Sequence, residues 1–400
     1  MVHQGHDVTV VCSQHSGRNF EILNGVKIVS FAISGNIVNG IRGESKAYQA
    51  YLLEQNYDVI SNFAAQQWAS DLMFPLLTKI NAVKIFVPTG FSGLHVLGYK
   101  DYFENMKNWM KAYDMSIFLS DSYRDIDYAR KNGIEKRLII PNGASYAEFS
   151  EQTEIDCRAE LGIAKDSFLI IHIGSHTGCK GHREAIEIFN KARLKNVTLL
   201  ILGDYLSPTS EIVPERAVGL LPKLKNLVKR LLGKPLQNCP WICTVAEELF
   251  NNKKHNIRNK KKVLIREMGR RHTVALLKES ALFLFPSNIE CSPIVLFEAM
   301  AAKTAFISSD VGNVKEIVQW TGGGVVAKTV INKFGFSKIS IRDVVKKLEM
   351  LYHDPGRLLE LAESGFESWK KNYTWENISN MYLDVYKSKL QTQRETNDIS

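Results

Sequence analysis

The sequence has no apolar run long enough to cross a membrane. Such a span needs about 18–20 uninterrupted apolar residues, and none occurs among the 400 residues. The opening stretch, MVHQGHDVTVV, also lacks the basic segment and following apolar segment of a secretory signal peptide. We therefore expect a cytoplasmic protein, with any membrane contact limited to peripheral binding at the inner face of the cell membrane.

Cysteine is scarce and scattered, which argues against a disulfide framework. The six cysteines stand at positions 12, 157, 179, 239, 243 and 291. Cys239 and Cys243 are close together, but no second pair or histidine cluster in the sequence completes a zinc site with them. Reduced thiols and no bound metal are the simplest interpretation.

Positive charge is concentrated in one part of the chain. The composition is that of an ordinary globular protein, with 45% hydrophobic and 23% charged residues, and the formal net charge is +9. Residues 215–271 contain 15 Lys and Arg but 4 Asp and Glu, a net charge of +11. The rest of the chain is therefore slightly acidic, and the basic character belongs to this segment rather than to the whole fold.

Short apolar runs alternate with amphipathic stretches along most of the chain, which is typical of β–α–β units in a parallel sheet. The predicted strands are residues 57–62, 83–87, 115–119, 137–140, 168–173, 197–202, 262–266 and 282–285. We therefore predict an α/β fold with doubly wound sheets. In such sheets ligands bind beyond the carboxyl ends of the strands.

Residues 282–310 read as strand, loop, helix and strand. We predict that the helix begins at Pro293, with Ser292 as its N-cap. The free N–H groups of Ile294 and Val295 at the helix start, with the positive end of its dipole, form a site suited to phosphate.

Two carboxylates in this stretch need an explanation. Glu298 interrupts a helix that is otherwise apolar on nearly every face, and a carboxylate is almost never buried unless it is paired or used. Glu290 lies eight positions earlier, in the loop. The alternatives are a buried ion pair for Glu298 and an ordinary solvated loop carboxylate for Glu290.

The segment PSNIECSPIVLFEAMAAKTAFISSD resembles the signature of the retaining nucleotide-sugar glycosyltransferases of glycosyltransferase family 4. The resemblance implies that Glu290 contacts the transferred sugar and that Glu298 accepts hydrogen bonds from the ribose hydroxyls. It also implies that the helix start, with Ser292, Ile294 and Val295, holds the diphosphate.

The loop GSHTGCKG after the strand 168–173 resembles the family's Gly-Arg-x4-Lys-Gly loop, in which Arg and Lys bind the diphosphate. Gly174, Lys180 and Gly181 match, but Ser175 replaces the arginine and carries no charge. We expect Lys180 to act with Glu290 in catalysis, and His176 is a candidate to supply the missing contact. The alternatives are a solvated loop lysine and a bystander histidine.

The first residues resemble an interior part of the family's N-terminal domain. GHDVTVVC matches its second strand, so a first strand and a glycine-rich loop are expected ahead of it, and the chain resembles a family member that lacks them. The family's first-domain histidine is expected within VPTGFSG, which contains no histidine. His95, a few residues later, is therefore a candidate for that role.

The resemblance implies the GT-B architecture, with two Rossmann-like domains facing across a cleft. We place the acceptor domain at residues 1–145 and the nucleotide-sugar domain at 150–365, and we expect C-terminal helices at 366–390 that cross back to the first domain. The implied reaction moves a sugar from a nucleotide-diphosphate donor to a glycan or lipid-linked acceptor, with retention and without a required metal or other cofactor. A role in cell-surface polysaccharide or glycolipid biosynthesis follows from the same resemblance.

An insert at 205–262 interrupts the family pattern. Within it, residues 219–234 predict a helix with one apolar face and a basic remainder, of the kind that lies on anionic lipid. A helix packed on the protein with a solvated basic face is the equal alternative. Nucleic acid is not an expected partner, because no aromatic stacking platform accompanies the charge.

Two other functions remain open from the sequence. One is another GT-B enzyme, such as a sugar-nucleotide epimerase or a phosphorylase. The other is a non-catalytic nucleotide-binding or membrane-associated protein of the same fold, which Ser175 favours and the two glutamates disfavour.

Overall fold

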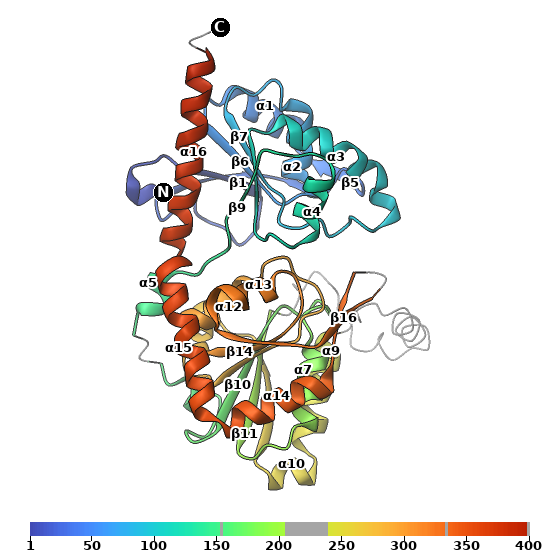
Figure 1. Cartoon of the computed structure of the whole chain (residues 1–400), viewed down its shortest axis with the longest axis vertical. Coiled ribbons are helices and arrows are strands. Elements are labelled where there is room, and N and C mark those ends of the chain that lie inside the picture. Colours follow the sequence, from blue (N-terminus) through green and yellow to red (C-terminus); the bar gives the residue numbers. More distant parts are fainter. Residues whose placement is uncertain (153–154, 205–238, 333–334, 398–400) are drawn as a thin grey trace. The chain divides into compact units, whose positions relative to one another are not determined.

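The computed structural model describes residues 1–152, 155–204, 239–332 and 335–397 (Figure 1). The chain divides into two compact units. One contains Met1–Pro141 and Glu376–Ser400, and the other contains Asn142–Trp375.

The second unit is built on a six-stranded sheet with the order β12-β11-β10-β13-β14-β15, and every neighbouring pair in it is parallel. Its strands are β10 (Phe168–Ile173), β11 (Val197–Leu202), β12 (Lys261–Arg266), β13 (Leu282–Phe285), β14 (Ala305–Ser309) and β15 (Gly324–Ala327). A hairpin of β16 (Thr329–Ile331) and β17 (Ser337–Ile339) follows. The predicted strands 168–173, 197–202 and 282–285 are confirmed at both ends.

Helices cover both faces of this sheet, which explains why its strands are continuous apolar runs (Figure 1). Alternate strand residues enter two separate cores: Leu169 and Ile171 pack on one face, and Ile170 packs on the other. The helices of this unit are α5 (Tyr146–Ser150), α6 (Cys157–Glu160), α7 (His182–Lys191), α9 (Cys239–Asn251), α10 (Lys254–Arg258), α11 (Arg270–Lys278), α12 (Ile294–Ala301), α13 (Val314–Thr321), α14 (Ile341–His353) and α15 (Pro355–Asn372). The doubly wound prediction is confirmed for this unit.

A buried lysine fastens the end of α7 to the sheet. Lys261, at the start of β12, is 5% exposed, and its ammonium donates to the carbonyl oxygens of Phe189 at 2.6 Å and Ala192 at 2.8 Å. These carbonyls belong to the last turn of α7 and its C-cap, where carbonyl oxygens lack N–H donors within the helix. Burial lowers the pKa of Lys261 to about 8.

The first unit distributes its strands over three sheets. A parallel sheet has the order β6-β7-β8-β9, a mixed sheet has the order β1-β3-β2, and β4 pairs with β5. The strands are β1 (Thr9–Ser13), β2 (Ile22–Leu23), β3 (Val26–Phe31), β4 (Ile33–Asn36), β5 (Gly40–Gly43), β6 (Val59–Phe63), β7 (Val83–Val87), β8 (Met115–Phe118) and β9 (Arg137–Ile139). The helical segments are η1 (Val2–Gln4), α1 (Ser45–Glu54), α2 (Trp68–Met73), η2 (Phe74–Leu76), η3 (Leu97–Tyr99), α3 (Lys100–Ala112), α4 (Arg124–Lys131) and α16 (Trp375–Asn397).

The first unit also includes the end of the chain. The Ser61 and Tyr386 hydroxyls lie 2.7 Å apart, and the ring of Phe63 packs against that of Tyr382. The helix α16 therefore packs beside β6, a strand more than 300 residues earlier in the sequence.

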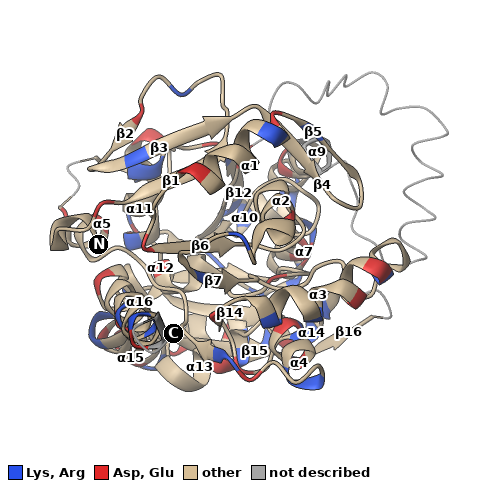
Figure 2. Cartoon of the chain, turned by 90° about the horizontal axis from the view of Figure 1, so that it is seen from above, with Lys and Arg blue, Asp and Glu red and all other residues tan. Residues whose placement is uncertain are grey.

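The insert is only partly described. The predicted basic helix at 219–234 lies outside the described residues, and α9 and α10 form the described end of the insert. The ribbons of the described helices carry acidic and basic residues together (Figure 2). Within the described part of the chain, no helix has the length and apolarity required to span a bilayer.

Candidate active site

Four strand ends in the second unit bring polar loops to one edge of the sheet. The strands β11, β10, β13 and β14 are consecutive neighbours and all parallel, so the loops that follow them leave the sheet on the same side. The chain runs outward from β10 to β11 and β12, and then returns to place β13 on the other side of β10. The carboxyl ends of the neighbouring strands β10 and β13 therefore form the topological switch point, where doubly wound sheets bind their ligands.

The loop after β10 is held tightly against the loop after β13. Gly181 has a φ of +80°, and a Cβ at this position would lie 2.1 Å from the carbonyl oxygen of Pro286. The backbone N–H of Asn288 donates to the carbonyl oxygen of Cys179 at 2.8 Å. Only glycine allows this approach at position 181, which accounts for Gly181 in the motif.

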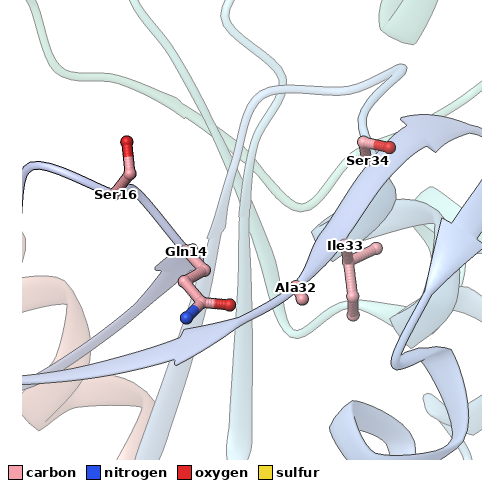
Figure 3. A pocket seen from close by; sticks show the side chains of 5 residues that line it. All are labelled: Gln14, Ser16, Ala32, Ile33 and Ser34. Carbon is pink, nitrogen blue, oxygen red and sulfur yellow. The ribbon is translucent and has the colours of Figure 1, made fainter.

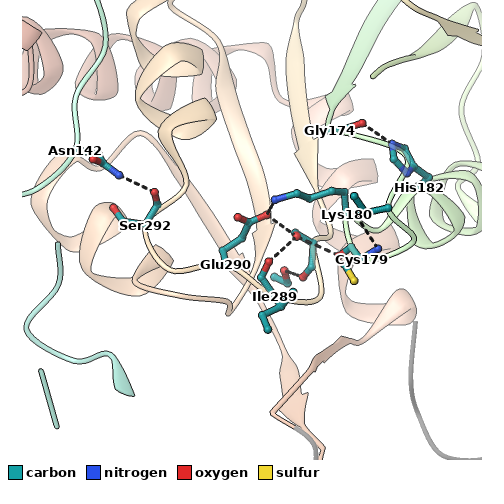
Figure 4. Close-up of polar contacts among 11 residues, drawn as sticks. Asn142, Gly174, Cys179, Lys180, His182, Ile289, Glu290 and Ser292 are labelled. Carbon is teal, nitrogen blue, oxygen red and sulfur yellow. Dashed lines mark hydrogen bonds and ion pairs between the residues drawn. The ribbon is translucent and has the colours of Figure 1, made fainter. Parts of the chain in front are cut away.

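Lys180 and Glu290 meet across the switch point. The Lys180 ammonium donates to Glu290 Oε1 at 2.8 Å, and the Ser287 hydroxyl donates to the same oxygen at 2.7 Å (Figure 4). The Lys180 side chain is 29% exposed and the Glu290 side chain 12% exposed. The solvated-loop alternatives for both residues are thus replaced by a half-buried ion pair that joins the loops after β10 and β13.

The helix α12 begins one residue later than predicted. Pro293 is the N-cap residue and makes no side-chain capping bond, so the predictions of Ser292 as the N-cap and Pro293 as the first helical residue are wrong. Ser292 instead lies in the preceding loop, where its carbonyl oxygen accepts a 2.8 Å hydrogen bond from the Asn142 side chain (Figure 4). Ile294 and Val295 form the first turn, whose N–H groups have no acceptor within an α-helix.

Glu298 is paired with an arginine. Its Oε1 lies 2.7 Å from Nη2 of Arg270, the first residue of α11. Arg270 also donates to both carboxylate oxygens of Glu148 in α5, at 2.6 and 2.7 Å. These hydrogen bonds lower the pKa of Glu148 and raise that of Arg270. The ion-pair alternative for Glu298 is therefore realised, and the pair leaves 14% of its side chain exposed.

Four further predicted residues lie outside these two ion pairs. Gly174 follows β10 and donates to the carbonyl oxygen of Leu202 at 2.9 Å, and Ser175 is partly exposed. The His176 side chain is fully buried, and its ring stacks on that of His182. His95 belongs to the first unit and is exposed. The sequence analysis assigned no site role to Ser287, Asn142 or Arg270. Ser287 stands within the resembled segment PSNIECSPIV, whereas Asn142 and Arg270 lie outside it.

A separate hollow in the first unit lacks the chemistry of this site. It has a volume of about 380 Å³ and is lined by Gln14, Ser16, Ala32, Ile33 and Ser34 (Figure 3). None of these side chains is charged. We therefore place the candidate site at the strand ends of the second unit, where the ion pair and the helix start lie.

Comparison with known proteins agrees with this fold. Residues 244–365 match the family model described as "Glycosyl transferases group 1". The alpha-maltose-1-phosphate synthase of Mycolicibacterium smegmatis is 30% identical over 124 residues, which make up 31% of this chain and 31% of that protein. The match thus spans about a third of the length of this curated relative.

Solved structures resemble the chain over most of its length. Sucrose-phosphate synthase from Thermosynechococcus elongatus has a TM-score of 0.70 at 16% identity, covering 98% of this chain and 91% of that one. Anabaena HepE in complex with UDP-glucose has a TM-score of 0.59 at 14% identity, covering 86% of this chain and 82% of that one. The chain therefore has the GT-B fold, and its residues 244–365, which include Glu290 and α12, match the glycosyl transferases of group 1.

Proposed function

We propose that this protein is a glycosyltransferase that moves a sugar from a nucleotide-diphosphate donor to an acceptor, with retention at the anomeric carbon. The observation that carries the proposal is the Lys180–Glu290 pair at the switch point, 2.8 Å apart and beside the start of α12. The family match over residues 244–365 supports it independently.

The residues around this pair suit the charges that develop in sugar transfer. An ammonium has three donors, so Lys180 can keep its bond to Glu290 while another N–H contacts a diphosphate oxygen. The N–H groups at the start of α12 add positive potential where the leaving diphosphate gains charge. Glu290 supplies a carboxylate that orients the sugar as positive charge develops at its anomeric carbon.

Lys180 carries the positive charge of its loop alone. No other lysine or arginine stands in the sequence GSHTGCKG, because Ser175 replaces the expected arginine. We propose that the ammonium and the helix start stabilise the leaving group without a metal ion. This makes the reaction more dependent on Lys180 than it would be in a loop with two cations.

The donor and acceptor classes are proposed from the comparisons and from the sequence. HepE is described in complex with UDP-glucose, so uridine diphosphate is the first nucleotide to test. The curated relative is named as a synthase of a sugar phosphate, whereas the resemblance described above favours a glycan or lipid-linked acceptor in cell-surface polysaccharide or glycolipid biosynthesis. Acceptor assays should therefore include sugar phosphates beside glycans and lipid-linked sugars.

A thermal-shift panel of nucleotide diphosphates tests the donor site directly. One nucleotide should raise the melting temperature, because a ligand at 100 times its dissociation constant stabilises the folded state by about 2.7 kcal/mol. Lys180→Met should weaken binding of that nucleotide roughly 10- to 100-fold, since a charge-assisted hydrogen bond contributes about 1.5–3 kcal/mol. Glu290→Gln should retain the nucleotide and lose transfer.

Lys191→Met is the matched control for Lys180. Lys191 pairs with Glu187 at 2.8 Å on α7, and its side chain is 56% exposed. This variant should bind the nucleotide as the wild type does. No shift with any nucleotide would contradict the proposal, as would equal binding by wild type and Lys180→Met. Binding without transfer to any acceptor would favour a non-catalytic nucleotide-binding protein, and NMR of a transferred sugar would settle retention.

We further propose a peripheral location at the inner face of the cell membrane. It rests on the basic segment 215–271, whose net charge of +11 exceeds that of the whole chain. Anionic lipid attracts such segments by about 1 kcal/mol for each basic residue near the surface.

A further inference from the structure

Three side chains of types that can bind metals converge at the loop that carries Lys180, two from neighbouring positions and one from a distant helix. They are His176 in the loop, His182 at the start of α7, and Cys243 in α9, and their ligand atoms all lie within 4.8 Å of one another. The exposed fractions are 0% for His176 and 1% for each of the other two. The three side chains are therefore shielded from water, unlike polar side chains that lie near one another on the surface by chance.

The backbone around the cluster favours a ligand role for His182. Its Nε2 lies 2.9 Å from the carbonyl oxygen of Gly174. A carbonyl oxygen only accepts, so Nε2 carries the proton and donates, and Nδ1 holds the lone pair. Histidines that bind metals usually donate their other N–H to a backbone carbonyl or carboxylate in this way, which fixes both tautomer and ring orientation.

The other two groups are also held in place. The backbone N–H of His176 bonds to the carbonyl oxygen of Asp204 at 3.4 Å, beyond the end of β11. Cys243 belongs to the core that packs α9 and α7 on the sheet, together with Ala185, Ile188 and Phe250. The three ligands thus come from a loop, a helix start and a second helix that meet at one point.

We propose that His176, His182 and Cys243 bind a late transition-metal ion, for which Zn²⁺ is the best candidate. Two imidazoles and one thiolate are a ligand set that Zn²⁺ prefers, with Zn–N distances of about 2.0–2.1 Å and a Zn–S distance of about 2.3 Å. Tetrahedral geometry at these lengths sets ligand atoms about 3.5 Å apart. The cluster, at 4.8 Å or less, must close by up to about 1.3 Å. The rings of His176 and His182 are stacked nearly parallel, 9° apart, so the ring of the loop residue His176 must also turn for both nitrogens to face the ion.

The ion would have a structural role that is separate from sugar transfer. It would join α9 to the loop 174–181 and to the start of α7, and so hold the backbone on both sides of Lys180. This inference revises the expectation that the chain binds no metal, while the proposed transfer chemistry still requires none. Its test uses no nucleotide, so it can fail or succeed independently of the proposed function.

The test is metal binding by the untagged full chain under reducing conditions. After treatment with a chelator, the protein is mixed with Zn²⁺ or Co²⁺, desalted, and analysed for metal content and absorption. We expect one ion per chain, and for Co²⁺ a thiolate-to-cobalt charge-transfer band with the visible bands of a tetrahedral site. Zn²⁺ should also protect one thiol from alkylation and raise the melting temperature.

Variants separate this site from adventitious binding. Cys243→Ser should lose the charge-transfer band. Loss of a residue that only supports a metal ligand typically weakens metal binding roughly 10- to 100-fold, and His176→Gln, which removes a ligand itself, should weaken it by more. Cys157→Ser, which removes a fully buried cysteine elsewhere in the same unit, should bind as the wild type does. The proposal is overturned if wild type retains no ion, or if it binds an ion without the thiolate band.

If Cys243→Ser does not fold, alkylation of the wild type followed by mass spectrometry must identify Cys243 as the thiol that Zn²⁺ protects. Protection of another cysteine would equally overturn the proposal.

Discussion

Glu298 is a carboxylate in a helix otherwise built from apolar residues, and Arg270 is its partner at 2.7 Å. Arg270 is itself held by both oxygens of Glu148. A buried ion pair and a ribose-binding carboxylate are therefore compatible interpretations. The arginine offsets the cost of placing Glu298 in the helix, and its bond to Oε1 orients the carboxyl group.

The two glutamates should differ in what they bind. We expect Glu298→Ala to weaken binding of both the free nucleotide diphosphate and the sugar nucleotide, because each lost charge-assisted hydrogen bond costs about 1.5–3 kcal/mol. Glu298→Gln should lose less, because one acceptor oxygen remains. Glu290→Ala should spare the free diphosphate and impair binding or turnover of the sugar nucleotide. Isothermal titration calorimetry with both ligands measures the difference.

Glu148→Gln provides the control for this pair. It removes the other partner of Arg270 without changing Glu298, so nucleotide affinity should stay within a few fold of wild type. Equal loss of diphosphate binding in Glu290→Ala and Glu298→Ala would refute the division of roles. A loss of stability in Glu298→Ala with unchanged nucleotide affinity would leave Glu298 with a purely structural role.

The start of α4 is joined to the loop after β7 by one buried carboxylate. Asp125 is 1% exposed, and its Oδ2 accepts from the backbone N–H of Gly90 at 2.8 Å, while Oδ1 accepts from Ile126 at 3.0 Å. Burial raises the pKa of Asp125 to about 6, although these bonds oppose the shift. The folded state thus holds a proton on this group more tightly than the unfolded chain does.

The sign of the resulting pH dependence follows from linkage. The contribution of Asp125 to stability is fully present below the unfolded pKa of 3.8 and is lost as pH rises through about 6. Asp125→Asn cannot titrate, so the stability of wild type relative to this variant should fall between pH 4.5 and 7.5, by on the order of 2 kcal/mol. Urea unfolding at several pH values measures this difference.

Asp127→Asn is the comparison on the same helix, since the Asp127 side chain is 52% exposed and pairs with Arg130. Its stability difference from wild type should change far less over this pH range. If the stability of wild type relative to Asp125→Asn stayed constant or grew as pH rises, burial would not raise the pKa of Asp125.

At the scale of the whole molecule, the uneven distribution of charge leads to a prediction about membranes. The predicted basic helix 219–234 lies outside the described residues, so its test depends on the sequence alone. Vesicles that contain anionic lipid should sediment the protein, and neutral vesicles should not, with binding that fades as salt screens the charges. Changing Lys223, Lys225, Lys229 and Arg230 together to Gln should abolish sedimentation and leave the melting temperature nearly unchanged.

A second variant with the same loss of charge shows whether vesicle binding depends on this segment or on the net charge of the protein. Changing Lys346, Lys370, Lys371 and Lys387 to Gln alters four exposed positions elsewhere in the chain and should preserve vesicle binding. Equal sedimentation with neutral vesicles would favour a helix packed on the protein, as would a large drop in stability when the basic segment is changed.

The sequence by itself determined the central strands of the second unit's sheet and most of its candidate donor-binding residues, whereas β15, β16 and β17 were not predicted. Buried parallel strands leave continuous apolar runs, so β10, β11 and β13 were predicted at both ends. The spacing of Glu290 and Glu298 and the loop around Lys180 are local patterns, and they too can be read from neighbouring residues. The single-residue error at the start of α12 is not of this local kind, because Ser292 is held in the preceding loop by Asn142, 150 residues away in the sequence.

Only the tertiary structure decided which of these residues meet. Lys180 and Glu290 are 110 residues apart, and they pair because β13 lies beside β10 although β11 and β12 intervene in the sequence. Arg270 bonds to Glu148, 122 residues earlier, and also pairs with Glu298. The thiol of Cys243 lies within 4.8 Å of ring nitrogens of His176 and His182, which belong to an earlier loop and helix. Strand order and helix packing set these contacts. Both depend on how whole helices and strands pack their apolar faces together, and no short stretch of sequence contains that information.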